Sequence, residues 1–166
     1  MSKAFTKDDD SAAPALVPPR APLPPGRPNY VTVRGLGLLR EELAALRADH
    51  AAASARGDLS LAAGVAERTS ELEARLATAE VVPVPSPAPS EVRFGASVTV
   101  RGDSGVARTY AIVGVDEADA SAGRIAFVAP LARALIGKRA GEAAVVRTPR
   151  GDEELEVVSV RYEATP

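Results

Sequence analysis

The sequence predicts an α+β protein with an N-terminal antiparallel coiled-coil hairpin and a C-terminal antiparallel sheet that carries one short helix. Leucines spaced alternately three and four residues apart indicate a coiled-coil seam, and they are Leu36, Leu39, Leu43 and Leu46. Beyond residue 90 the apolar period changes to two, which is typical of strands. A Pro-rich stretch separates the two patterns and predicts a linker.

Composition narrows the function classes. The 166 residues include 46% hydrophobic but only 4% aromatic residues, so any core must consist mainly of Val, Leu, Ile and Ala. The net charge of −2 argues against a protein that binds nucleic acid chiefly by counterion release. A protein partner is therefore the first expectation.

Two residue counts exclude further kinds of site, and the hydropathy pattern excludes two kinds of segment. The chain has no Cys and one His, which excludes disulfides, zinc-thiolate sites, cysteine nucleophiles and multi-His metal sites. No apolar run is long enough for a membrane span, and the charged start "MSKAFTKDDD" lacks the apolar region of a signal peptide. We expect a cytoplasmic monomer that has no cofactor and does not bind membranes.

The N-terminal segment is acidic at first and then Pro-rich. It shows no apolar period that could bury enough surface to offset the chain entropy lost on folding. We predict a disordered arm over residues 1–28.

Residues 29–80 are predicted to form the hairpin. Thr32 is a suitable N-cap for the first helix and Gly57 a suitable C-terminal stop. Asp58 or Ser60 then caps a second helix, whose apolar spacing runs on to Ala79. The first arm, of about 23 residues, would be roughly 35 Å long.

Four prolines between Val81 and Ser90 predict a semi-rigid linker over residues 81–90. Residues 91–163 follow as the sheet domain, with five candidate strands separated by Gly, Asp and Ser turns. The strand segments are "VRFGASVTVRG", "ARTYAIVGV", "GRIAFVA", "EAAVVRTP" and "EELEVVSVRYE". The segment "PLARALIGK" predicts the short helix, because Pro130 suits its first turn and Gly137 its end.

Residues 29–163 resemble the GreA/GreB transcription elongation factors. The most specific matches are Phe94 with Gly95, "IVGVDEAD" at 112–119 and "APLARALIG" at 129–137. The segments "MSKAF" and "NYVT" resemble the GreB branch.

The resemblance implies an FKBP-like C-terminal domain that docks on the RNA polymerase core enzyme at the rim of its secondary channel. It also implies a hairpin that enters the channel, so that contact with RNA or DNA is indirect. In the family, two acidic residues at the hairpin tip help to hold a second magnesium ion, and the polymerase then cleaves backtracked RNA.

The tip, which consists of Asp58, Leu59, Ser60 and Leu61, departs from this pattern. Leu61 stands where the family has a glutamate, so one carboxylate remains. Two carboxylates can share a hard cation that one alone holds poorly. We therefore predict that Asp58 serves as a turn or helix cap rather than as a magnesium contact.

The arms are also shorter than the family pattern by roughly eight to ten residues each, or about 12 to 15 Å of reach. The predicted docking residues are Ala129, Pro130, Leu131 and Arg133. Val128 and Ala129 replace the polar residue and serine that are common before the proline. This "AP" also resembles Rnk, a short-hairpin relative described as a regulator of nucleoside diphosphate kinase.

The prediction is a polymerase-binding transcription regulator with weak or no stimulation of transcript cleavage. One alternative is a functional cleavage factor, and another is an Rnk-like interaction module with a target other than the polymerase. The chain shows neither a phosphate-binding loop nor a Ser-His-acid set, so we expect no enzyme. Asp116, Glu117 and Asp119 are interpreted as a solvated turn, and Arg40 and Arg47 as a solvated helix face. His50 is interpreted as a seam or surface residue.

Overall fold

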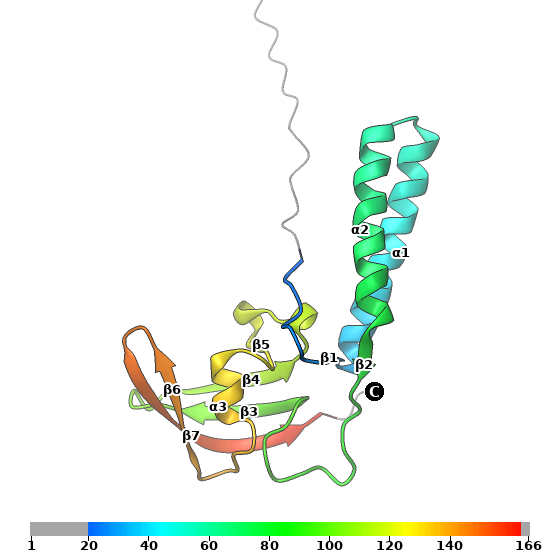
Figure 1. Cartoon of the computed structure of the whole chain (residues 1–166). Coiled ribbons are helices and arrows are strands. Elements are labelled where there is room, and N and C mark those ends of the chain that lie inside the picture. Colours follow the sequence, from blue (N-terminus) through cyan, green and yellow to red (C-terminus); the bar gives the residue numbers. More distant parts are fainter. Residues whose placement is uncertain (1–19, 164–166) are drawn as a thin grey trace, which may run out of the picture.

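The computed structural model describes residues 20–163. A helical hairpin stands beside a curled sheet, and a short helix packs on the sheet (Figure 1). Most of the predicted disordered arm, residues 1–19, lies outside the described residues. The remainder, residues 20–28, lies beside the hairpin, and Arg20 forms ion pairs with Glu42 on the hairpin and with Asp116 of the sheet domain.

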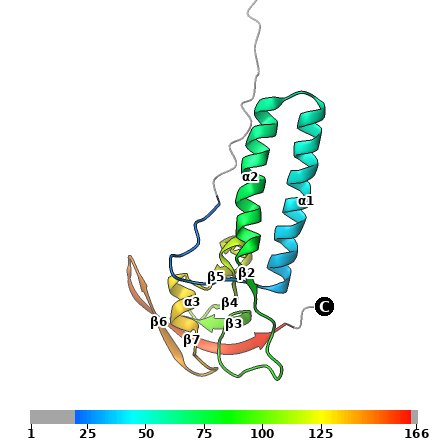
Figure 2. The same cartoon turned by 45° about the vertical axis from the view of Figure 1, so that its right-hand side comes forward.

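The hairpin consists of α1 (Val33–Ala55) and α2 (Leu59–Ala77), which lie side by side and antiparallel (Figure 2). Thr32 is the N-cap of α1, as predicted, and its Oγ1 accepts a hydrogen bond from the amide of Gly35 at 2.8 Å. The seam buries residues expected from the leucine spacing, together with Val31 from the preceding segment. They are Val31, Leu39, Leu46, Val65 and Leu72. His50 is exposed, whereas Ala53 is fully buried.

Two short strands at the base of the hairpin were not predicted. β1 (Asn29–Val31) pairs in parallel with β2 (Ala79–Val81). The helical spacing predicted to reach Ala79 was wrong, because α2 ends at Ala77 and Thr78 is its C-cap. Strands of three residues are too short for a period to show, and they pair because the hairpin brings its two ends together.

The main sheet has the strand order β5-β4-β3-β7-β6. Its strands are β3 (Ala96–Arg101), β4 (Ala107–Val113), β5 (Arg124–Ala126), β6 (Ala143–Thr148) and β7 (Gly151–Tyr162). All five predicted strand segments contribute a strand. The predicted antiparallel arrangement holds for three of the four strand pairs, whereas β5 pairs in parallel with β4.

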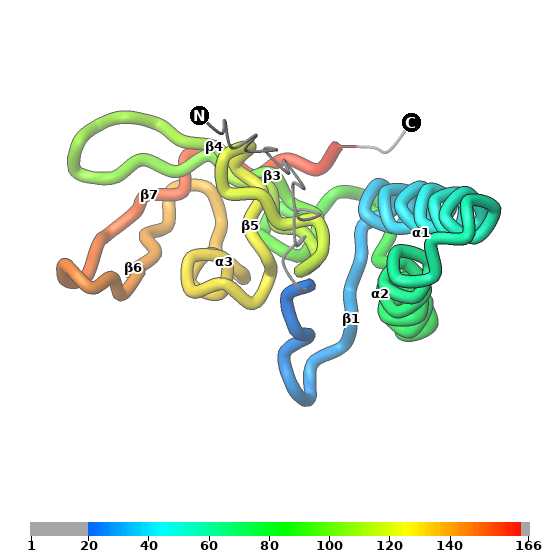
Figure 3. The backbone as a smooth tube through the Cα atoms, turned by 90° about the horizontal axis from the view of Figure 1, so that it is seen from above, coloured from blue at the N-terminus to red at the C-terminus, as the bar shows by residue number. Residues whose placement is uncertain are grey.

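The parallel pair arises from the connection between β4 and β5. This connection contains two 3-10 turns, η1 (Val115–Glu117) and η2 (Ala120–Ala122). It crosses back along the sheet, so that β5 starts again beside Ala111. The connection also places η1 against the hairpin (Figure 3).

The short helix α3 (Pro130–Leu135) covers the inner face of the sheet. Pro130 is its first residue, and Gly137 follows its end with φ of 87°, a backbone conformation that favours glycine. The core consists of aliphatic side chains and is built around Val92, Val98, Ile112, Leu135 and Val157, all fully buried. None of the helices within residues 20–163 is long and apolar enough to cross a membrane.

Candidate functional site

The turn between α1 and α2 is the hairpin tip, and Asp58 begins its second helix. Gly57 adopts φ of 72°, which lets the chain reverse after α1. Asp58 is the N-cap of α2, and its Oδ1 accepts a hydrogen bond from the amide of Leu61 at 3.0 Å. The structure thus shows Asp58 in the predicted capping position.

The exposed surface of the tip carries two leucines beside its single carboxylate. Leu59 is 80% exposed and Leu61 is 40% exposed. Asp58 is the only Asp or Glu between His50 and Ala66. Within residues 20–163, no group of three or more His, Cys, Asp or Glu side chains could hold a metal ion.

The predicted docking residues lie on and next to α3. Pro130 and Arg133 are exposed, whereas Leu131 packs against the sheet core. Ala129 precedes Pro130 at the N-cap position, where no side chain accepts a capping hydrogen bond. The exposed face also includes Ile136, which is 40% exposed and was not among the predicted docking residues.

The junction between hairpin and sheet contains an aromatic cluster that sequence reasoning missed. The rings of Tyr30, Phe94 and Phe127 lie with their centroids 5.6 to 5.8 Å apart. Tyr30 belongs to β1, Phe94 precedes β3 and Phe127 follows β5. Aromatic residues are scarce in this chain, so their presence on both sides of the linker was a usable signal of a packed junction.

The acidic turn η1 is the second part of this junction. The hydroxyl of Thr32 donates to Oε2 of Glu117 at 2.5 Å, and Nη1 of Arg34 donates to Oε1 of the same carboxylate at 2.9 Å. The Glu117 side chain is 4% exposed. The interpretation of Glu117 as a solvated turn residue was wrong, because the start of α1 covers it.

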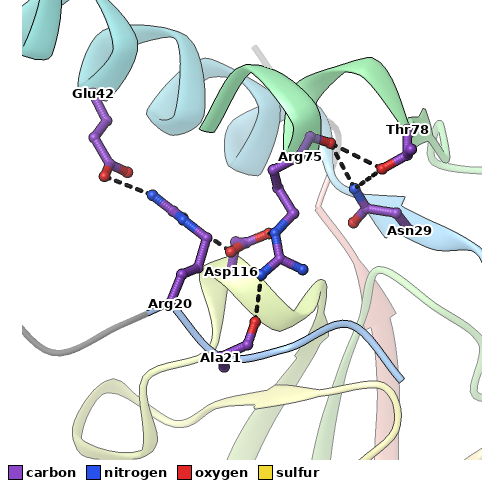
Figure 4. Close-up of polar contacts among 7 residues, drawn as sticks. All are labelled: Arg20, Ala21, Asn29, Glu42, Arg75, Thr78 and Asp116. Carbon is purple, nitrogen blue, oxygen red and sulfur yellow. Dashed lines mark hydrogen bonds and ion pairs between the residues drawn. The ribbon is translucent and has the colours of Figure 1, made fainter. Parts of the chain in front are cut away.

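Asp116 connects η1 to two further elements (Figure 4). Its Oδ1 accepts a hydrogen bond from Nη1 of Arg20 at 2.9 Å, and its Oδ2 lies 3.4 Å from Nε of Arg75 on α2. The side chain is 5% exposed, so it too was wrongly interpreted as solvated. A buried carboxylate needs charged partners, and these two arginines are 96 and 41 positions away in the sequence.

Asp119, in contrast, has a side chain that is 41% exposed, as expected for a turn residue. Its carboxylate accepts hydrogen bonds from the hydroxyl and amide of Ser121 and pairs with Arg124 at 2.8 Å. The hydrogen bond from the Ser121 hydroxyl is the main reason that the pKa of Asp119 lies below its ordinary value. Arg47 is likewise paired across the hairpin, with Glu73 at 2.7 Å.

The family model described as "Transcription elongation factor, GreA/GreB, C-term" matches residues 86–162. The transcription elongation factor GreA of Methylococcus capsulatus is 43% identical over 152 residues, which cover 80% of this chain and 96% of that protein. GreA of Ralstonia nicotianae is 39% identical with the same two coverages. Among solved structures, GreA factor homolog 1 (Gfh1) of Thermus thermophilus is 21% identical, with a TM-score of 0.40, and covers 81% of this chain and 99% of that one.

Over the matched region, this chain is also shorter than the Methylococcus protein. Because 80% of 166 residues is about 133, the 152 aligned positions leave about 19 without a counterpart in this chain. One fifth of this chain lies outside the match, and β1 begins only at Asn29. An identity of 43% across almost the whole of a GreA protein is far above chance, and the chain belongs to the GreA/GreB family of transcription elongation factors.

Proposed function

We propose that this chain binds the RNA polymerase core enzyme at its secondary channel and modulates transcription with weak or no stimulation of transcript cleavage. Factors of this family are not enzymes themselves and stimulate cleavage by the polymerase. The observation that carries the proposal is the hairpin tip, where Asp58 is the only carboxylate and caps α2.

The chemistry at the tip supports weak cleavage. Magnesium binds oxygen ligands in a near-octahedral arrangement, and a protein site for it is built from carboxylates that act together. Leu61 lies one helical turn beyond Asp58, where a second carboxylate would have to stand. Its exposed apolar side chain offers no ligand and suits contact with a protein surface instead.

The length of the hairpin supports the same conclusion. α1 has 23 residues and α2 has 19, so the longer arm extends roughly 35 Å. The match to the GreA of Methylococcus capsulatus leaves about 19 positions without a counterpart in this chain, a number within the range expected when eight to ten residues are missing from each arm. The tip would then stop short of a metal ion in the active site of the partner.

The surface of α3 is the proposed docking site. Pro130 and Arg133 are exposed on a helix that the sheet core holds in place through Leu135. We propose that the chain acts as a cytoplasmic monomer and that it meets RNA or DNA only within the elongation complex.

Two assays test this function together. Retention of the chain on purified core polymerase is expected, and it tests binding. A backtracked elongation complex incubated with the chain is expected to yield little new cleavage product, whereas a GreA protein in parallel yields abundant product. Strong cleavage that Asp58→Ala abolishes would instead establish the first alternative, a functional cleavage factor.

A second candidate function rests on the Ala129-Pro130 pair and the short hairpin, which both resemble Rnk. In that case the chain would be an interaction module with a target other than the polymerase. Failure to bind core polymerase under conditions that retain a GreA protein would favour this candidate.

A further inference from the structure

We propose that residues 20–28 form an intramolecular strap that sets the angle of the hairpin relative to the sheet domain, with Arg20 as its clasp. This role concerns contacts within the chain alone and does not depend on polymerase binding. Three features support it: how the two parts are connected, where the strap is anchored, and what Arg20 joins.

The covalent connection between the parts is a single segment. The chain runs from α2 through β2 and residues 82–95 to β3, so this linker alone joins the hairpin to the sheet. The angle between them must therefore depend on noncovalent contacts at the junction.

Most of these contacts lie close to the pivot. Tyr30 in β1 meets the aromatic cluster, and Thr32 and Arg34 at the start of α1 meet Glu117. Contacts near the base of the hairpin fix the position of the base better than the angle of the hairpin. A contact further along the hairpin is needed to hold that angle.

Arg20 supplies that contact (Figure 4). Its Nη2 donates to Oε1 of Glu42 at 2.6 Å, and its Nη1 donates to Oδ1 of Asp116 at 2.9 Å. Glu42 lies nine positions beyond Val33, about 14 Å up α1. One guanidinium therefore links the side of the hairpin to η1 of the sheet domain and restrains the angle between them.

The positive charge of Arg20 is matched by the carboxylates of Glu42 and Asp116. Burial disfavours the charged form of Arg20, yet the hydrogen bonds to Glu42 and Asp116 outweigh it and leave the pKa of Arg20 above its ordinary value. The guanidinium is thus held as a cation between two anions. A planar guanidinium with several donors is suited to such a two-sided contact.

The strap is anchored to α2 at both ends. Near its start, the side chain of Arg75 donates to the carbonyl of Ala21. Directly after its end, at the start of β1, the side-chain amide of Asn29 donates to the carbonyl of Arg75 at 2.9 Å and to Oγ1 of Thr78 at 3.2 Å. Four prolines between these anchors reduce the conformational entropy that the strap loses when it is ordered.

Distance measurements between two spin labels test the strap. The chain has no cysteine, so Ser60→Cys at the tip and Ser104→Cys in the β3–β4 turn, both exposed, can be labelled selectively. Double electron–electron resonance on the full chain is expected to give one narrow distance distribution. Arg20→Ala is expected to broaden or shift it, whereas Arg27→Ala, an exposed arginine on the same segment, leaves it unchanged.

A second pair of variants tests the same contact of Arg20 from its partner on the hairpin, Glu42. Glu42→Gln is expected to broaden the distribution as Arg20→Ala does, and the neighbouring Glu41→Gln is not. Circular dichroism shows whether each variant keeps its helical content. Arg75 still faces Asp116 in both test variants, so folding is expected to persist. A narrow, unshifted distribution in Arg20→Ala or Glu42→Gln would overturn the proposal.

Discussion

The hydroxyl oxygen of Thr32 lies 2.5 Å from Oε2 of Glu117, although the two residues are 85 positions apart. The same hydroxyl accepts the amide of Gly35 and so caps α1. One side chain therefore starts the hairpin and fastens it to the sheet domain. This joint couples the beginning of α1 to its packing against η1.

Two glycines of α1 are expected to respond oppositely to alanine. A Cβ on Gly35 would lie 2.7 Å from Oε2 of Glu117, whereas nothing lies within 4 Å of a Cβ on Gly37. Alanine favours a helix interior over glycine by about 1 kcal/mol. Gly37→Ala should raise the free energy of unfolding by up to about that amount. Gly35→Ala should lower it by about 1 kcal/mol, because it displaces a buried, hydrogen-bonded carboxylate.

Urea unfolding of the two variants beside the parent chain measures this difference. Equal stabilisation by both substitutions would show that the contact of Glu117 with α1 contributes nothing.

The cap at the tip is expected to act through its side-chain oxygen rather than its charge. Asp58→Ala removes the acceptor for the amide of Leu61 and should lower the free energy of unfolding by about 1 kcal/mol. Asp58→Asn keeps an acceptor and should change it by only a few tenths. Urea unfolding distinguishes the two variants, and an equal loss in both would indicate that the negative charge matters more than the cap.

Leu61→Glu tests whether the missing carboxylate or the short hairpin limits transcript cleavage. Residue 61 is the third residue of α2, and a glutamate there reaches back to the cap in the capping-box arrangement. The variant should therefore be at least as stable as the parent chain. It should not gain strong cleavage of backtracked RNA, because the arms remain short. Cleavage at the level of a GreA protein would show that the missing carboxylate was the sole deficiency.

Docking through α3 is expected to depend on Arg133. Arg133→Glu reverses an exposed charge while leaving the buried face of the helix intact, and should weaken binding to core polymerase about tenfold, or about 1.4 kcal/mol. Arg147→Glu, on the exposed face of β6, is the matched control and should bind like the parent. Equal binding by both variants, measured by titration of labelled polymerase, would place the interface elsewhere.

Tyr162 is expected to make stability fall at high pH. Its hydroxyl donates to the carbonyl of Glu91 at 2.6 Å and accepts the amide of Arg93 at 2.9 Å. Burial raises the pKa of Tyr162 above its ordinary value of about 10. Between about pH 10 and the higher folded value, the folded chain binds more protons than the unfolded chain, so stability decreases as pH rises.

Tyr162→Phe removes this part of the pH dependence and should cost about 1 to 2 kcal/mol at neutral pH. Urea unfolding at about pH 7 and about pH 11 compares the two chains below and above the ordinary tyrosine pKa of about 10. The difference between parent and variant should shrink at the higher pH. A constant difference would contradict the role assigned to the phenol.

The sequence by itself determined the features that depend on near neighbours in the chain. Leucine spacing located the seam of the hairpin, and Thr32, Gly57 and Asp58 marked where its helices begin and end. Alternation located all five strands of the main sheet. Such patterns are local because helix and strand contacts repeat every few residues.

Only the tertiary structure decided what the acidic turn does. Asp116 and Glu117 follow a strand, as solvated turn residues often do, and their arginine and threonine partners lie between 41 and 96 positions away. The parallel pairing of β5 and the anchoring of Arg20 also depend on how the chain crosses the sheet. Periodicity carries no information about such distant pairs, because their partners meet only when the hairpin and the sheet are packed together.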